Sequence, residues 1–329
     1  AQNPGAKGVF GVSPTYHGIC SDMKGLIDVT HRGGGIFIAD EAHGNHVYFH
    51  EDLPEGALRL GADLACQSIH KMSGSLTQSS LLHLKSGRID LSRLKANLQL
   101  AQNTSPSYLL MASLDLARSF IATEGHALFD RLIPEIDAAR EEMKKIPGIE
   151  VLDKGLAGTC GIFAYEPMRL VFSAREMGVE GYELYDVLRD AYGIEIEFGD
   201  YYYAICVLGL GTEKGDLDRL IRALKDLSSR RHGLRPPLAW DEELPGIPPM
   251  AMLPRRAHFA ERERVSWADA KGRVSAEMVV PYPPGIPVLC PGEIVTDEVW
   301  DFLDYQNRNG RHLHGPESGK LTHLHVVRE

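Results

Sequence analysis

The chain has 329 residues, of which 43% are hydrophobic and 24% charged, and its formal net charge at pH 7 is -10. This composition is typical of a globular protein of about two domains, and it excludes the disordered, collagen-like and coiled-coil classes. No apolar run reaches the length of a membrane-spanning helix, and the negative charge disfavours broad binding to nucleic acid. We therefore expect no membrane and no nucleic acid among its partners.

The cysteines and the first residues bear on the compartment of the protein. Its five cysteines are odd in number, far apart and without a C-x-x-C pair, namely Cys20, Cys66, Cys160, Cys206 and Cys290. This spacing favours buried thiols over a disulfide framework or a zinc site. The first residues lack the basic and then apolar pattern of a leader. Both observations predict a cytoplasmic protein.

The first third of the sequence alternates short apolar runs with a helical pattern. The apolar runs occupy residues 9–12, 36–39 and 64–66. Between the first two, with Ser21 as the expected N-cap, apolar positions recur at helical spacing at Met23, Leu26, Ile27 and Thr30. Such strands between helices predict parallel β-α-β units with both faces of the sheet covered. Polar residues with a chemical role are then expected at the carboxyl ends of the strands.

The remainder of the chain divides into three stretches. Residues 90–145 carry a helical pattern that ends at Pro147 and Gly148. Residues 149–231 mix helices, the last around Leu217 to Leu227, with strands expected at 149–152, 170–172, 194–198 and 204–208. Prolines between 236 and 254 mark a linker. We predict a partial α/β large domain over 1–147, a small α+β domain over 148–233, and a linker with a C-terminal domain over 234–329.

One short motif suggests a helicase. Asp40-Glu41-Ala42-His43 spells the DEAH box, which holds magnesium on a nucleotide. That function also requires a phosphate loop, G-x-x-x-x-G-K-[ST], and the nearest match begins at Gly315, is one residue short and ends in Leu321. Together with the acidic charge, this departure argues against a helicase.

A different chemistry links Asp40 to Lys71. Asp40 ends one apolar strand, and Lys71 follows the next strand in Ser68-Ile69-His70-Lys71. Pyridoxal phosphate needs such a pair, because a lysine amine binds it covalently and a carboxylate keeps its pyridine nitrogen protonated. Ser68 offers a hydroxyl for the phosphate. On spacing alone, a surface lysine and a helix-capping aspartate would give the same pattern, so both interpretations stay open.

The sequence resembles the Orn/Lys/Arg decarboxylases. These are pyridoxal-phosphate enzymes of fold type I in the aspartate aminotransferase superfamily. The resemblance rests on segments in the same order, at residues 13–18, 40–44, 68–72, 76–80, 104–108, 282–287 and 291–293. These segments span most of the chain. The resemblance implies an α/β fold with a three-layer, transferase-like large domain that is truncated at its N-terminus, a smaller α+β domain and the family's C-terminal domain.

The resemblance also implies a role for each matching residue. Lys71 would bind the cofactor covalently, Asp40 would face the pyridinium nitrogen, and Ala42 and His43 would lie beside the ring. Ser68 and His70 would lie at the phosphate and the lysine, with His70 also a proton relay. Thr104 would reach the phosphate of a neighbouring subunit, which implies a homodimer or a higher homo-oligomer. Thr15 would lie at the face of the cofactor or at its phenolic oxygen.

The activity implied by the resemblance is decarboxylation of a basic amino acid, with arginine favoured over lysine and ornithine, to give a polyamine precursor. The cationic end of such a substrate needs a facing carboxylate. Glu197 matches the family's glutamate at that place, and Asp200 is a second candidate. Because Glu195 and Glu197 would share one face of a strand, a solvent-facing role for Glu197 also stays open.

The histidines are not expected to bind a metal ion. His43, His46 and His50 have nearly helical spacing, but Gly44 lies among them and predicts a loop. Two H-x-H pairs near the C-terminus are expected at a surface or an interface, and they comprise His312, His314, His323 and His325. The sequence therefore predicts no metal site.

The chain departs from the family in one respect, because the family's first strands, its phosphate-binding turn and the histidine that stacks on the pyridine ring have no counterpart here. We therefore expect a carboxyl-terminal portion of a decarboxylase, either a gene fragment or half of a split protein, that binds the cofactor weakly or not at all by itself. Two other functions stay open. One is an aminotransferase, which uses the same Asp and Lys but usually needs an arginine for the α-carboxylate. The other is a non-catalytic interaction protein.

Overall fold

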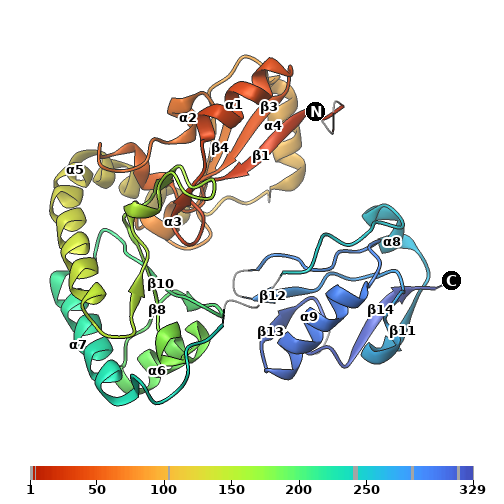
Figure 1. Ribbon diagram of the computed structural model, residues 1–329. Coiled ribbons are helices and arrows are strands. Elements are labelled where there is room, and N and C mark those ends of the chain that lie inside the picture. Colours follow the sequence, from red (N-terminus) through yellow and green to blue (C-terminus); the bar gives the residue numbers. More distant parts are fainter. Residues whose placement is uncertain are drawn as a thin grey trace. The chain divides into compact units, whose positions relative to one another are not determined.

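The computed structural model describes residues 3, 5–102, 104–239, 244–282, 285–316 and 319–328. The chain divides into two compact units, Ala1–Leu238 and Ala239–Glu329 (Figure 1). The predicted boundary between 147 and 148, inside the first unit, stays a prediction. Part of the second proline cluster and part of the segment that resembles a phosphate loop lie outside the described residues, namely Pro283, Pro284, Glu317 and Ser318.

A four-stranded sheet forms the N-terminal part of the first unit. Its strands are, in spatial order, β1 (Gly8–Val12), β3 (Ile36–Asp40), β4 (Leu64–Gln67) and β5 (Leu81–Leu84). β1, β3 and β4 are parallel, which confirms the predicted β-α-β units, whereas β5 is antiparallel to β4. Asp40 pairs with Val12 on one side and with Cys66 on the other. The parallel register therefore brings the carboxyl ends of β3 and β4 together.

The helix between β1 and β3 covers one face of this sheet. It is α1 (Met23–Arg32), and its buried Met23 and Ile27 pack in one cluster with Phe37 of β3. The prediction of Ser21 as the N-cap was wrong by one residue, because the carboxylate of Asp22 accepts the Gly25 amide hydrogen at 2.8 Å. The short elements of this region are β2 (Ile19–Cys20), η1 (Asn45–Tyr48), α2 (Ala57–Leu60) and α3 (Ile69–Met72).

The outer strand of the sheet is open to solvent. Val9, Phe10 and Val12 of β1 are 40%, 64% and 50% exposed. The prediction that both faces are covered is therefore wrong at β1.

The helical stretch predicted over 90–145 consists of two helices. α4 (Leu91–Ala101) buries none of its residues, whereas α5 (Tyr108–Lys144) runs for 37 residues and buries most of its apolar side chains in its C-terminal half. The chain leaves α5 through Gly148, whose φ of +80° favours glycine because a side chain would be strained there.

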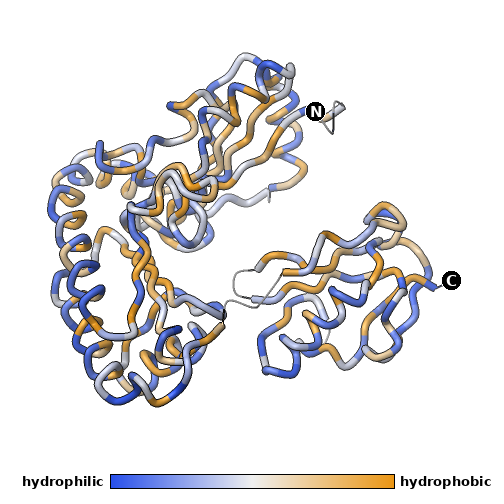
Figure 2. Tube along the Cα trace, viewed as in Figure 1, coloured by the Kyte–Doolittle hydropathy of each residue, from blue (hydrophilic) through white to orange (hydrophobic). Residues whose placement is uncertain are grey.

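An antiparallel sheet forms the remainder of the first unit. Its strands, in spatial order, are β6 (Glu150–Val151), β8 (Arg169–Ser173), β10 (Ala204–Val207) and β9 (Phe198–Gly199). Helices α6 (Gly181–Tyr192) and α7 (Lys214–Arg231) belong to this part, and Figure 2 shows hydrophilic and hydrophobic residues alternating along α7. β7 (Ala164–Tyr165) pairs with β2, and the short helices η2 (Lys154–Leu156) and η3 (Arg175–Met177) complete it.

The strand predicted at 194–198 is wrong over most of its length. Only Phe198 and Gly199 pair with β10. α6 ends at Gly193 in a left-handed conformation, and the Ile194 amide then donates to the Leu188 carbonyl at 2.9 Å. This capping geometry occupies the residues that would have begun the strand.

One hydrophobic core joins α5, α7 and the antiparallel sheet. Its buried members reach from Val47 to Leu227, and Phe129, Phe172 and Leu224 are completely buried within it. The thiol prediction holds only in part. Cys20 and Cys206 are buried, and burial raises the pKa of each thiol to about 12. Cys66 and Cys160 are exposed, because Cys66 lies on the open face of β4 and Cys160 lies in a turn.

The second unit has its own core. Its elements are α8 (Pro254–Phe259), β11 (Arg262–Ser266), η4 (Trp267–Asp269), β12 (Val280–Tyr282), α9 (Asp297–Arg308), β13 (His312–His314) and β14 (His323–Val327). β11 pairs with β14 and β12 with β13 in two separate antiparallel ladders, and Trp267 and Leu303 are buried between these elements. Among the described residues of the chain, no helix combines the length and the apolar character needed to cross a bilayer.

Candidate active site

The carboxyl ends of β3 and β4 position Asp40 and Lys71. Asp40 is the last residue of β3, and its Oδ1 accepts the Ala42 amide hydrogen at 2.9 Å, which fixes the carboxylate at the start of the following turn. β4 ends at Gln67, Ser68 precedes α3, and Lys71 lies within that single turn of helix. Because β3 and β4 are parallel neighbours, the two chemical groups lie at the same edge of the sheet.

His43 contacts the amine of Lys71. The distance from Lys71 Nζ to His43 Nε2 is 3.2 Å. Burial lowers the pKa of His43 to about 3, with a further contribution from the positive charges of Arg169 and Lys71. The imidazole is therefore neutral, and its Nε2 accepts a hydrogen from the lysine amine. The other ring nitrogen, Nδ1, is buried and has no hydrogen-bond partner in the structure.

Tyr16 completes this group, and no role was expected for it from the sequence. Its ring lies 4.4 Å from the His43 ring and 5.8 Å from Lys71 Nζ, both measured to the centroid of the tyrosine ring. A cation over an aromatic face is attracted by the ring quadrupole. The only signal in the sequence was the position of Tyr16 just after a strand, next to Thr15.

The remaining residues expected at the cofactor take different positions. Thr15 Oγ1 accepts the Ile19 amide hydrogen at 3.1 Å, so its hydroxyl is used within its own turn. His70 Nδ1 lies 2.7 Å from the Ser79 carbonyl, and the Ser68 carbonyl accepts a hydrogen from the Asn45 amide group at 2.9 Å. Thr104 is exposed between α4 and α5.

The two candidate carboxylates for the substrate lie in different surroundings. Asp200 Oδ2 is 2.7 Å from His17 Nε2, and Phe198 packs edge-on against Tyr16, with 5.2 Å between the ring centroids. Asp200 is thus linked to the turn that holds Tyr16. Glu197 is exposed and borders a separate cavity of about 330 Å³ whose lining does not include Lys71.

A cluster of buried charged residues, which the sequence analysis did not identify, contacts the residues of this site. Arg169 of β8 is completely buried, and its guanidinium donates to the His43 carbonyl at 3.3 Å and approaches Met72 Sδ at 3.2 Å. Its ion-pair partner Glu166 lies at 3.4 Å and also contacts His46 Nε2 at 3.0 Å. Burial alone would raise the pKa of Glu166, but His46 and Arg169 outweigh burial and lower it. Arg169 therefore fixes the backbone at His43 and contacts the side chain of Met72, which follows Lys71.

A cavity of about 590 Å³ borders Lys71. Its lining is mostly apolar and comes from α3, from α5 and from the turn after β10, and it includes His70, Lys71, Met72, Leu116, Phe120 and Leu210. A cavity of this size is in the range of small-molecule sites.

The histidines around Gly44 and those near the C-terminus lie in different surroundings. His43, His46 and His50 contact three different partners, namely Lys71, Glu166 and Asp130. The C-terminal pairs lie on β13 and β14, in different ladders, and His325 Nδ1 lies 3.2 Å from Glu277 Oε2.

The fold is that of pyridoxal-phosphate enzymes of fold type I. The structure is similar to the crystal structure of the lysine decarboxylase LdcF of Francisella novicida, with a TM-score of 0.78 at 22% identity over 98% of this chain and 57% of that chain. It is also similar to the constitutive lysine decarboxylase of Escherichia coli, with a TM-score of 0.77 at 21% identity over 98% of this chain and 58% of that chain.

Sequence comparison defines the family. The model of the Orn/Lys/Arg decarboxylase major domain matches residues 2–169, and that of the C-terminal domain matches residues 241–318. The chain belongs to the Orn/Lys/Arg decarboxylase family. It is 39% identical to the arginine decarboxylase of Halalkalibacterium halodurans over 99% of this chain, and 36% identical to that of Bacillus subtilis over 100% of it. The chain spans 67% of the length of each of these two relatives.

Proposed function

We propose that this chain provides the lysine and the cofactor-binding turn of a pyridoxal-phosphate-dependent decarboxylase of basic amino acids, with arginine as the favoured substrate and lysine and ornithine next. The observation that carries the proposal is the meeting of Lys71, His43 and Asp40 at one edge of the parallel sheet. Arginine is favoured because the relatives at 36–39% identity are named arginine decarboxylases.

The residues present fit the cofactor. Lys71 is exposed at the edge of a largely apolar cavity, and the unpartnered, buried Nδ1 of His43 lies in the turn beside it. Lys71 would bind the aldehyde carbon, Asp40 would face the pyridine nitrogen, and Ala42 and His43 would lie beside the ring. Ser68 and His70 would lie at the phosphate and the lysine, and Thr15 would lie at the face of the cofactor or at its phenolic oxygen. Thr104 would reach the phosphate of a neighbouring subunit in a homodimer. When bound, pyridoxal phosphate draws electrons away from the substrate Cα.

Side chains of this chain hold and transfer the protons that the reaction needs. The neutral His43 accepts a hydrogen from Lys71 Nζ and so fixes the position of the amine beside the turn after β3. The Ser79 carbonyl takes a hydrogen from His70 Nδ1 at 2.7 Å, which leaves Nε2 of His70 as the nitrogen that exchanges a proton. Either Lys71 or His70 can then return a proton to the substrate carbon.

The substrate needs its carboxylate oriented and its cationic end neutralised. The apolar lining of the cavity, including Leu116 and Phe120, disfavours a solvated carboxylate and so favours its loss as carbon dioxide. For the cationic end, the contacts support Asp200 more strongly than Glu197, because Asp200 lies beside the turn of Tyr16. Both remain part of the proposal.

The structure favours decarboxylation over transamination. A transaminase usually needs an arginine that is open to the substrate α-carboxylate. Arg169 lies near Lys71 but is completely buried and paired with Glu166, so its guanidinium is occupied. A cytoplasmic location is part of the same proposal.

Two measurements test the proposal. The first is the visible absorbance of lysine-bound cofactor in protein incubated with pyridoxal phosphate, both for this chain and for this chain fused to the upstream segment of the Bacillus subtilis relative. The second is carbon dioxide release from arginine, lysine and ornithine by the fused protein. We expect both signals in the fused protein, their loss in Lys71→Ala, and their retention in Lys154→Ala, whose side chain is 85% exposed. Inactivity on all three amino acids would contradict the decarboxylase, and absence of the absorbance would contradict the cofactor.

A further inference from the structure

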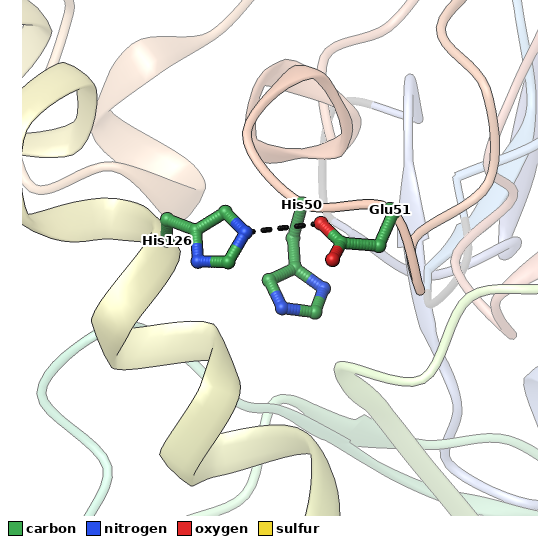
Figure 3. A group of neighbouring side chains, drawn as sticks. All are labelled: His50, Glu51 and His126. Atoms are coloured by element: carbon green, nitrogen blue, oxygen red, sulfur yellow. Dashed lines mark hydrogen bonds and ion pairs between the residues drawn. The ribbon is translucent and has the colours of Figure 1, made fainter.

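A second cluster of histidines and carboxylates lies where the turn after η1 meets α5. Within the described ranges of the chain, it is the one group of at least three such residues whose ligand atoms all lie within 4.8 Å of one another, and it comprises His50, Glu51 and His126. His126 Nε2 is 3.0 Å from Glu51 Oε2. Figure 3 shows His126 on α5 and the two turn residues facing one another. None of these side chains takes part in the site at Lys71.

One carboxylate orients both imidazole rings. Asp130, one turn of helix after His126, places Oδ2 3.0 Å from His126 Nδ1 and Oδ1 3.2 Å from His50 Nε2. Each ring therefore donates one N–H to Asp130 and keeps its opposite nitrogen for another partner. Histidines that bind metals almost always donate their second nitrogen to a carboxylate or a carbonyl in this way.

The opposite nitrogen of His50 is already in the form that binds a cation. His50 Nδ1 accepts the backbone amide hydrogen of Asp52 at 3.1 Å, so its lone pair is unprotonated. On His126 the corresponding atom is Nε2, which donates its hydrogen to Glu51 Oε2 at 3.0 Å, and a bound metal ion would take the place of that hydrogen. Two imidazole nitrogens and one carboxylate therefore converge from the turn and from the helix.

We propose that His50 Nδ1, Glu51 and His126 Nε2 form a binding site for a divalent transition-metal ion of the zinc type, with Asp130 as the residue that orients both histidines. Two histidines and one glutamate are an established zinc ligand set that leaves a fourth position for water. Tetrahedral zinc, with bonds of about 2.0–2.1 Å, separates its ligand atoms by about 3.3 Å. The contact between His126 and Glu51 at 3.0 Å needs to open only slightly to admit the ion. The amide hydrogen bond of Asp52 would be replaced by the metal bond.

One histidine of the proposed site is buried, whereas its other residues are open to solvent. The His50 side chain is only 3% exposed and packs against Phe129, with 6.2 Å between the ring centroids, whereas the Glu51, His126 and Asp130 side chains are 73%, 58% and 60% exposed. The carboxylates of Glu51 and Asp130 both lie within 3.0 Å of His126, and their negative charge attracts a cation. An ion at this position would tie the turn after η1 to α5.

Titration of the metal-stripped full chain with Zn²⁺ and Co²⁺ tests the site. We expect one Zn²⁺ per chain by equilibrium dialysis, an intense visible Co²⁺ spectrum typical of tetrahedral coordination with nitrogen ligands, and a rise in Tm of about 5 °C at a hundredfold excess of Zn²⁺ over its Kd. Glu51→Gln and His126→Ala should each weaken binding at least about tenfold. Asp130→Asn should weaken it by about 10–100-fold through loss of orientation.

Two matched controls decide between this site and others. His232→Ala removes an exposed histidine at the end of α7, and the double variant His312→Ala/His314→Ala removes neighbouring histidines of the second unit, whose rings lie 4.5 Å apart. Both should bind Zn²⁺ as the wild type does. Absence of saturable binding, or binding that survives Glu51→Gln and His126→Ala, or binding lost in the His312→Ala/His314→Ala variant, would each overturn the proposal. The variants Glu51→Gln and Asp130→Asn change only exposed groups, so they test the site without disturbing the fold.

Discussion

Replacing Arg169 by methionine should strongly destabilise the first unit. The guanidinium of this completely buried residue lies 3.4 Å from Glu166 Oε2 and 3.3 Å from the His43 carbonyl. Methionine keeps much of the apolar volume and removes the charge. Glu166 would then be left buried with the contacts from His46 Nε2 at 3.0 Å and from the Met168 amide at 2.7 Å.

The size of the effect follows from the geometry. Two charges at this separation attract by about 5 kcal/mol at an effective dielectric constant of about 20. Removal of one partner of a buried pair costs about 3–5 kcal/mol, because the other charge stays buried without compensation. We therefore expect Arg169→Met to lower the free energy of unfolding by about 3–5 kcal/mol. The double variant Arg169→Met/Glu166→Gln should lose less, since no uncompensated charge remains.

Urea denaturation followed by far-ultraviolet circular dichroism measures this free energy. Arg118→Met is the matched control, because Arg118 pairs with Asp115 on the surface, where both side chains are more than half exposed. Such exposed pairs contribute about 0–1 kcal/mol. If Arg169→Met destabilised the protein no more than Arg118→Met, the buried pair would not have the structural role described above.

Three further predictions concern packing, backbone and pH. Phe129→Ala removes a completely buried ring from the core on α5 and should cost about 3–5 kcal/mol in thermal unfolding. Gly181→Ala should lower the free energy of unfolding by at least about 2 kcal/mol, because a Cβ there would lie 2.1 Å from the Tyr203 carbonyl oxygen. Gly215→Ala, where a Cβ would meet no atom within 4 Å, should raise it by about 0.4–1 kcal/mol. Equal Tm values for the two variants would refute this reasoning. Burial would raise the pKa of Asp63, but hydrogen bonds from Ser86, the Phe37 amide and His31 outweigh burial and lower it. The ionised Asp63 therefore stabilises the fold above its unfolded pKa of about 3.9, and this stabilisation is lost as the pH falls through the folded pKa. Asp63→Asn should therefore reduce stability at pH 7 and flatten its decline below about pH 4, and a decline as steep as that of wild type would contradict the assignment.

The sequence patterns predicted the elements whose signals are local. The apolar runs that end at Asp40 and precede Ser68 are β3 and β4, and their parallel pairing follows from the helices between strands. The contact between His43 and Lys71 was within reach for the same reason, because both residues follow these strands.

Features that depend on contacts between distant residues could not be predicted in this way. Arg169 meets His43 only because β8 packs beneath the turn after β3, and nothing in the surrounding sequence marks a buried arginine. The pairing of His50 with Asp130 likewise joins residues on different elements, which is why the histidine spacing around Gly44 did not predict their partners. The error at 194–198 has a local cause, since the left-handed turn at Gly193 competed with a convincing alternation of side chains.

The length of α5 has a consequence for how the first unit unfolds. Its early residues Ala117 and Phe120 form part of the cavity wall beside Lys71, and its late residues Ile136 and Met143 lie in the core with α7. A helix of 37 residues extends about 55 Å, so one continuous element links the cavity beside α3, which follows β4, with the antiparallel sheet at β6. If the region at either end of α5 unfolded, the helix would lose the packing that stabilises it, and the region at its other end would be destabilised as well. We therefore expect residues 1–238 to unfold in a single cooperative transition, and proteases to release no stable fragment that contains only one of the two sheets.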